Sequence, residues 1–543
     1  MATKNNHPFY DWVPRPVGIL ILLLMFVPPT FSGGAYLCNI GEMSGSLGIW
    51  TEEIQLASFF TSIGMCLFPP FMVGFLKARR VKHTYLYCFL ILIPLNYICA
   101  VTTSVYVLLI ACLLIGFVRI MVMLNCTFTI APYLTGMDTL AMFTMKEEPS
   151  PEVQYSLERK RTFLMPVLYT FILAISQASN LLVSWFAYEY RWQDAYIVVV
   201  GMLAVAMLLI FITMPSEKRS TAYKPEWRKV PEMLLMAGAL CVLSYMLVFG
   251  KTLDWFQSLN LRFALGLLLV LVAIFLLFSI RNGDEAYLPL VSFSYRNVWM
   301  SMLLFLLTMV LNSANVFVST FAKISTAINN VQSASLSAWA IVGCVAGLLI
   351  SLLLIGKKVK FRLIFCVGFF LMAASNVYLY FQYQTMGLFS NMAIPTILNY
   401  SGLLILYSVV AAFGMKKLPS RFLATFVFLM IWMRNAIAPV VGSSIYSNWL
   451  NGKQQYYISR LVQNVDMENP LAASAFVRTA RVRQAGGKGT DEAQILATTS
   501  MKAQVAKQAT ITAMKDITGD TVILLAGAIA LTIILPYAKN ETT

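Results

Sequence analysis

The chain has 543 residues, of which 59% are hydrophobic and 12% are charged. This composition excludes an ordinary soluble globular domain, in which about a quarter of the residues carry a charge. The net charge of +16 would suit a nucleic-acid-binding protein, but the basic residues are spread over many short loops, so we expect no nucleic-acid partner.

Long apolar runs recur along the whole chain, and each is long enough to cross a lipid bilayer as a helix. Because lipid cannot satisfy open backbone groups, the predicted fold is an all-α polytopic membrane protein. The first run lacks a small-residue cleavage site, so we interpret it as a span and not as a signal peptide. We predict fourteen transmembrane helices, at Gly18–Leu37, Ile54–Leu76, Thr84–Val101, Val105–Ile130, Thr162–Phe186, Ala195–Met214, Met233–Gly250, Phe263–Ile280, Val298–Phe321, Leu336–Ile355, Leu363–Tyr380, Ile394–Gly414, Phe422–Tyr446 and Thr521–Leu535.

The charge distribution predicts the orientation of these spans. Lys and Arg are concentrated in the loops that follow even-numbered spans, and the short loops on the other side hold few of them. Cytoplasmic loops carry such an excess, so we expect both termini in the cytoplasm and the protein in a bacterial-type inner membrane. All nine cysteines lie in or beside spans, and the two histidines lie in a tail and a loop. We therefore expect no disulfide framework and no metal site.

A weak internal repeat is visible in two basic loops. Residues 79–82, Arg-Arg-Val-Lys, are followed by Cys88, and residues 357–360, Lys-Lys-Val-Lys, are followed by Cys366 at the same spacing. This offset maps spans one to six onto spans nine to fourteen and leaves spans seven and eight as an inserted pair. Any two cytoplasmic loops tend to be basic, which is the alternative explanation. Repeated bundles are common in transporters, and the pattern predicts a two-bundle transporter with two extra helices.

The repeat divides the chain into three units. We predict a six-helix bundle over 1–214, a linker with two inserted helices over 215–296, and a second six-helix bundle over 297–543. The second bundle contains a long outer segment, 447–520. Within it, the Ala-, Gln- and Lys-rich stretch Asp491–Ile517 predicts a helix leading into the last span, with a weakly apolar stripe formed by Ile495, Thr498, Val505, Ala509 and Thr512.

Several motifs carry a family resemblance. They are a cytoplasmic loop motif after span two (Gly74, Arg79, Arg80 and Lys82), Arg119 in span four, Arg191-Trp192 before span six, and Arg434-Asn435 in span thirteen. With the long outer segment, they make the chain resemble the fourteen-span drug:H+ antiporter family of the major facilitator superfamily, the EmrB/QacA type. The resemblance implies two bundles that rock about a central site, export of drug-like compounds by proton antiport, and a periplasmic adaptor and an outer-membrane channel as partners.

The chain also departs from that family's pattern. The acidic residue of the loop motif is Ala78, and the Gly-Pro motif of span five is replaced by Ser176–Asn180. These differences leave the coupling residues to be sought elsewhere.

Ionisable groups inside a bilayer are costly, so Arg119 and Arg434 are the first candidates for coupling or gating. Each also has a structural interpretation, because Arg119 can pair with polar neighbours and Arg434 can satisfy carbonyls freed by Pro439. No carboxylate lies at the centre of a span. Glu42 and Asp138, near span ends, are the remaining coupling candidates, although solvated interfacial residues would look the same.

Polar uncharged residues and one tryptophan within the spans are candidates for substrate binding or for contacts between helices. They are Asn39, Gln177, Asn180, Asn312, Asn315, Asn399 and Trp432. A phosphate-binding loop pattern is absent, so we expect neither an ATP cofactor nor an enzyme. The predicted function is a secondary active transporter that exports small amphipathic or drug-like compounds by alternating access with proton antiport. The alternatives are an uncoupled facilitator or importer of a metabolite, and a membrane sensor or assembly subunit that transports nothing.

Overall fold

Helices make up the protein. The computed structural model describes residues 8–72, 74–75, 80–135, 151–216, 226–326, 328–384, 387–463, 465–466 and 468–537, and within these ranges there is no β-strand. Thirteen helices in this part of the chain are long and apolar enough to span a membrane, and the shorter apolar segment Arg15–Phe31 lies where the first span was expected. The predicted all-α membrane fold is therefore confirmed.

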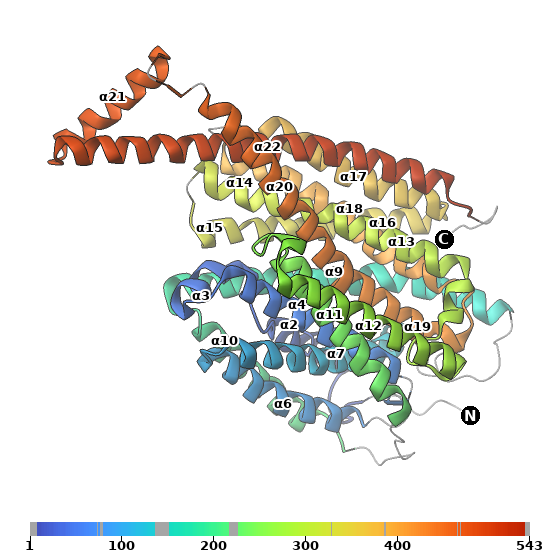
Figure 1. Cartoon of the computed structure of the whole chain (residues 1–543). Helices are drawn as coiled ribbons and strands as arrows, with labels where there is room; N and C mark the ends of the chain where they lie inside the picture. The colour runs from blue at the N-terminus through green and yellow to red at the C-terminus, as the bar shows by residue number, and fades with distance from the viewer. Residues whose placement is uncertain are drawn as a thin grey trace.

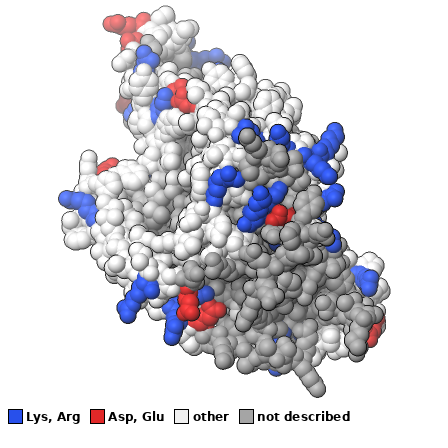
Figure 2. All heavy atoms as spheres, turned by 90° about the vertical axis from the view of Figure 1, so that its right-hand side faces the viewer, with Lys and Arg blue, Asp and Glu red and all other residues white. Residues whose placement is uncertain are grey.

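Both chain ends lie at the same end of the helical bundle (Figure 1). We call this the terminal end and the opposite one the far end. An even number of crossings requires this arrangement. Figure 2 looks onto the terminal end, where Lys and Arg side chains gather with fewer acidic side chains between them. An excess of Lys and Arg on one face is the feature on which the predicted orientation rests.

The first span is bent where two prolines interrupt its hydrogen bonding. It consists of α1 (Arg15–Leu24) and α2 (Val27–Phe31), with Pro28 and Pro29 inside the second piece. Proline has no amide hydrogen, so Pro28 cannot donate to the carbonyl four residues earlier, and the helix breaks just before it.

The other helices before residue 214 form, with α1 and α2, what we call the first half. They are α3 (Ile40–Leu47), α4 (Thr51–Leu67), α6 (Val81–Val101), α7 (Val105–Thr135), α9 (Pro151–Glu189) and α10 (Asp194–Thr213). The second half consists of α13 (Arg296–Asn312), α14 (Val316–Thr326), α15 (Asn330–Ala334), α16 (Leu336–Gly356), α17 (Phe361–Gln382), α18 (Ala393–Met415), α19 (Ser420–Ile431), α20 (Ala438–Val462), α21 (Pro470–Ala485) and α22 (Thr490–Ile534).

The same contacts recur in the two halves. In the first half, α7 packs on α4 and α6, and α6 also packs on α10. In the second half, α18 packs on α16 and α17, and α17 also packs on α22. These are the helices that the repeat in the sequence makes equivalent. The halves meet where α9 packs against α16 and α18.

Small residues let helices approach closely inside each half. Gly64 of α4 and Gly116 of α7 face each other's helix so closely that a methyl group on either would overlap a backbone carbonyl, that of Leu113 or of Thr61. Close packing through small residues replaces the hydrophobic effect, which is weak between helices in lipid. The α4–α7 pair therefore depends on both glycines.

The inserted pair, α11 (Val230–Phe249) and α12 (Leu259–Asn282), lies beside the two halves. α11 packs on α4 of the first half and on α20 of the second, whereas α12 packs mainly on α11. Apolar side chains of α12 such as Phe263 and Leu277 are exposed. These side chains suit a lipid environment, whereas α11 contacts both halves.

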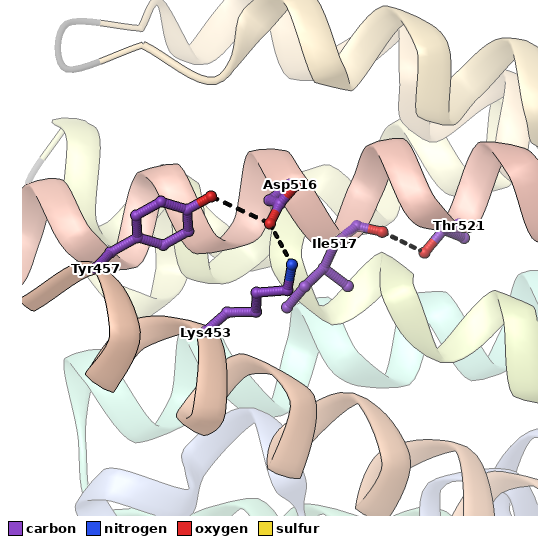
Figure 3. Close-up of polar contacts among 5 residues, drawn as sticks. All are labelled: Lys453, Tyr457, Asp516, Ile517 and Thr521. Carbon is purple, nitrogen blue, oxygen red and sulfur yellow. Dashed lines mark hydrogen bonds and ion pairs between the residues drawn. The ribbon is translucent and has the colours of Figure 1, made fainter. Parts of the chain in front are cut away.

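The expected outer segment, 447–520, is mostly helical. α20 continues to Val462, α21 follows, and α22 starts at Thr490, so that the three form a hairpin protruding from the far end (Figure 1). We call the part over 447–520 the outer hairpin. The predicted helix Asp491–Ile517 is present within α22. An ion pair ties the hairpin to itself, since Asp516 accepts from Lys453 at 2.5 Å and from the Tyr457 hydroxyl at 3.1 Å (Figure 3).

The apolar stripe predicted on this helix is exposed over most of its length, as a surface for a partner would be. Ile495 is 67% exposed, and Thr498 and Thr512 are exposed as well. The buried face of this part of α22 includes Ala493, Ala497, Ala509 and Ala513, together with Ile511 and Met514. This alanine face packs where α22 contacts α20 and α21, because small side chains allow three helices to approach closely. Ala509 is the one residue of the predicted stripe that also belongs to the buried alanines.

Candidate functional site

A cavity of about 550 Å³ lies between the two halves. Its walls come from α4, α7 and α9 on one side and from α13, α18 and α19 on the other. Most lining side chains are Met, Leu, Ile, Phe and Tyr. Hydrogen-bonding groups are few and scattered, and include Ser58, Ser62, Thr127, Ser176, Gln177 and Asn312. A mostly apolar cavity of this size with a few polar groups suits a small amphipathic molecule.

The charges that line the cavity are all positive. Arg119, Arg161 and Arg434 belong to it, and no Asp, Glu or His is among its described lining residues. Sequence reasoning missed Arg161, which it assigned to the loop before span five. α9 begins at Pro151, well before the apolar run, and so carries Arg161 into the cavity wall.

Arg434 lies on a widened turn. Residues Trp432–Ile437 form a π-helical segment between α19 and α20, and Pro439 follows it. Because Pro439 cannot donate a backbone hydrogen bond, the regular ladder ends at this point. Such π-helical turns often occur at functional sites, where they change the direction of a side chain.

Aromatic rings hold the guanidinium of Arg434 on two sides. Its Cζ lies 4.2 Å from the ring centre of Tyr407 on α18 and 4.9 Å from that of Tyr169 on α9. Its Nε donates to Asn435 at 3.3 Å, so the hydrogen bond goes to a side chain and not to a freed carbonyl. The side chain is only 8% exposed, and its Nη1 has no partner among the described residues. Arg434 therefore contacts both halves and still has a free donor.

Arg119 also has an unused donor. It lies on α7 with its side chain half-buried, and its Nε is enclosed by protein without a hydrogen-bond partner in the described part of the chain. An unpaired guanidinium donor in an apolar wall is costly unless a ligand satisfies it.

Some of the polar residues predicted from the sequence meet at the cavity. Gln177 and Asn312 line it, and Asn399 lies behind Asn312, to whose side-chain oxygen it donates at 2.9 Å. The others are not among its lining residues. Asn39 is buried and donates a hydrogen bond to the carbonyl of Val183 at 3.1 Å. Asn180 is exposed, and Asn315 and Trp432 are half-buried.

Trp432 does not line the cavity, although Arg434 on the same turn does. Its ring stacks on Phe428 with centroids 6.3 Å apart, one helical turn earlier on α19. Its ring nitrogen is buried without a described hydrogen-bond partner. Trp432 therefore packs beside the turn that carries Arg434.

The remaining candidates lie away from the cavity. Glu42 on α3 accepts a hydrogen bond from the side chain of Asn330 on α15, which joins the halves at the far end. In the loop motif, Lys82 donates to the carbonyl of Phe211 at 2.9 Å and so ties α6 to α10. Gly74 and Arg80 are half-buried, and Arg79 and Asp138 lie outside the described residues.

Hydrogen bonds join the halves at both ends of the bundle. At the far end the contact is Glu42 with Asn330. At the terminal end, the Glu158 carboxylate on α9 accepts from the backbone N–H of Lys417, just after α18, at 3.0 Å.

Comparison with known proteins finds similarity in structure but not in sequence. No protein-family model matches the chain, and no curated protein matches it in sequence. Among solved structures, a mutant of the peptide transporter POT matches with a TM-score of 0.55 and 13% identity, covering 95% of this chain and 94% of that one. The peptide transporter POT in complex with sulfate matches with a TM-score of 0.51 and 12% identity, covering 95% of each chain.

The nucleoside transporter NupG matches with a TM-score of 0.51 and 12% identity, covering 95% of this chain and 99% of that one. These likenesses do not point to the EmrB/QacA branch. They extend over nearly the whole chain and give the arrangement of its helices. The chain shares the fold of these solved transporters, in agreement with the predicted major-facilitator-like fold.

Proposed function

We propose that the chain is a secondary transporter that moves small amphipathic molecules across a membrane by alternating access. The observation that carries the proposal is the cavity of about 550 Å³ between the two halves, which hydrogen bonds also join at both ends of the bundle. Rocking of the halves would break one set of contacts while keeping the other. The cavity would then open to one side of the membrane at a time.

The proposal also includes the direction of transport and the coupling ion, which are export and the proton. Export with proton antiport is supported by the family resemblance and by the position of Glu42, whose carboxylate joins the halves. An uncoupled or exchanging transporter is the second candidate. The observation that favours it is that no described cavity-lining residue is a carboxylate or a histidine, the groups that usually relay protons.

The outer hairpin is the proposed docking element for a periplasmic adaptor. It protrudes from the far end (Figure 1), and several of its apolar side chains are exposed, among them Leu471, Val482 and Ile495. The alanine face of α22 is used within the hairpin. The exposed apolar residues are therefore the surface left for a partner.

Flux through the purified protein tests the proposal. Reconstituted in proteoliposomes, the chain should carry a labelled amphipathic compound across the bilayer at a saturable rate. Coupled proton movement would support antiport, and flux without it would support the exchanging or uncoupled alternative. A sensor or assembly subunit would give no saturable flux at all.

A further inference from the structure

We infer that the cavity binds the negatively charged group of an amphipathic organic anion, with Arg434 as its main anchor and Arg119 as a second donor. The inference rests on the proposed function, because it names the substrate class of the same site. The inference goes beyond the proposed function because it predicts the sign of the substrate's charge and the residues that recognise the charged group.

The first argument is the balance of charge. Arg119, Arg161 and Arg434 line the cavity, and none of its described lining residues is acidic. Guanidinium groups stay charged at any physiological pH. Charges attract strongly in apolar surroundings, so a cavity with this wall favours an anion and repels a cation.

The second argument is the unused hydrogen-bonding capacity. Arg434 is more than nine-tenths buried and lines the cavity, yet its Nη1 has no partner in the described structure. Arg119 leaves its Nε unpaired in the same wall. Buried polar groups are normally satisfied, so these donors indicate a ligand that accepts hydrogen bonds.

The third argument is the shape of the acceptor that would fit. The rings of Tyr169 and Tyr407 cover Arg434 at 4.9 and 4.2 Å, and Asn435 takes its Nε. The free donor therefore lies on the edge of the guanidinium. The edge of a guanidinium matches carboxylate, sulfonate or phosphate oxygens, and this matching is what distinguishes Arg from Lys.

The walls around the arginines describe the rest of the molecule. They are rich in Met, Leu, Ile and aromatic side chains, such as Met123, Leu168 and Met430. Such walls bind an apolar body, and flexible Met side chains adapt to different shapes. The substrate class is an aromatic or aliphatic body with one acidic group.

Arg434 is also placed to link binding with movement. Tyr169 belongs to α9 of the first half, whereas Tyr407 and Arg434 belong to the second half. Rocking of the halves changes the contact between Tyr169 and Arg434. An anion at this position therefore binds at the joint where the two halves separate.

Three matched probes test the inference on the full-length protein in lipid nanodiscs. They are 1-naphthoate, the neutral 1-naphthamide and the cationic 1-naphthylmethylammonium, which share one ring system. Calorimetry should show that naphthoate binds about tenfold more tightly than the other two, as expected for a hydrogen-bonded charge. Arg434→Gln and Arg119→Gln should each weaken naphthoate binding, with a smaller effect on the amide.

Two controls separate recognition from folding and from net charge. Arg434→Lys keeps the charge without the planar edge, and we expect partial recovery of naphthoate binding relative to Arg434→Gln. Arg481→Gln removes a charge from the exposed surface of the outer hairpin and should leave binding unchanged. A change with Arg481→Gln as large as that with Arg434→Gln would overturn the assigned site.

The outcomes distinguish the two levels of the proposal. Equal binding of the three probes, preference for the cation, or no naphthoate binding would overturn the anion inference. Flux of the amide or the ammonium in proteoliposomes would then still support the transporter. Binding of naphthoate that depends on Arg434, without flux of any probe, would support the anion site and contradict the proposed transport.

Discussion

The hydroxyl group of Tyr287 donates a hydrogen bond to the backbone carbonyl of Leu67 at 2.9 Å. Leu67 ends α4 of the first half, and the ring of Tyr287 also packs on Phe428 of the second half, with centroids 5.4 Å apart. The Glu232 carboxylate of α11 holds the backbone of Tyr287 by accepting a hydrogen bond from its N–H at 2.9 Å. The segment after α12 thus places a fully buried tyrosine between the halves.

We predict that Tyr287→Phe loosens this contact. The change removes one neutral hydrogen bond, worth about 1 kcal/mol, and keeps the ring packing. The cavity should then open more often toward the terminal end. A cysteine introduced at the cavity-lining Ser62 should react several times faster with an impermeant maleimide added on that side.

Tyr295→Phe is the matched control for this prediction. Tyr295 packs on Phe422, with ring centroids 5.5 Å apart, and its hydroxyl makes no hydrogen bond within the described part of the chain, so the labelling rate should not change. Equal labelling rates in wild type and Tyr287→Phe would contradict the role of Tyr287 in holding the halves together.

A second prediction concerns Glu42 at the far end. Glu42→Ala removes the acceptor for Asn330 and should increase labelling of the same cavity cysteine from the far side. Glu42→Gln keeps an oxygen acceptor and should leave labelling near the wild-type rate. If Glu42 also carries the coupled proton, Glu42→Gln should abolish proton-coupled flux while closure is retained.

Glu52→Gln provides the comparison. Glu52 is half-buried near the same end and accepts a hydrogen bond from Thr252 at 3.3 Å, outside the contact between α3 and α15. It should change neither labelling nor flux. Proton-coupled flux that survives in Glu42→Gln would show that Glu42 is not the coupling residue.

A third prediction tests the close packing of α4 and α7. Gly116→Ala places a methyl group against the carbonyl of Thr61 and should destabilise the protein by about 1–3 kcal/mol, the usual cost of overpacking. Gly201→Ala, on α10, meets nothing within 4 Å and should not destabilise it. Thermal unfolding of the two purified variants is the measurement, and similar melting temperatures would contradict the packing argument.

The sequence was sufficient to predict the spans because hydropathy is a local property. It also indicated Arg119 and Arg434, since a charge within an apolar run is visible without a structure. The partners of Arg434 could not be predicted in this way. Tyr169 and Tyr407 come from distant helices, and many tyrosines in the chain would have served equally well.

Two other features needed the fold for a different reason. Arg161 lies at the start of an apolar run, where charge patterns place the end of a span, yet α9 begins ten residues before it. The outer hairpin is polar enough to resemble a loop, but α20 runs on to Val462, and the alanines of α22 pack against α20 and α21. In both cases a helix extends beyond its apolar run, which hydropathy cannot detect.

The last prediction concerns the outer hairpin as a docking element. Replacing 470–485, the whole of α21, with a short Gly/Ser linker removes exposed Leu471 and Val482 but leaves the Lys453–Asp516 contact between α20 and α22. Because this contact holds the base of the hairpin, the membrane part should remain folded. If the hairpin recruits an adaptor, flux in proteoliposomes should be unchanged while export from intact double-membraned cells is lost. Leu471→Ser with Val482→Ser is the milder version, and we expect it to reduce export in cells without affecting purified flux. Full export by the cells that lack α21 would exclude the adaptor hypothesis, and loss of flux in proteoliposomes would assign α21 to the transport machinery instead.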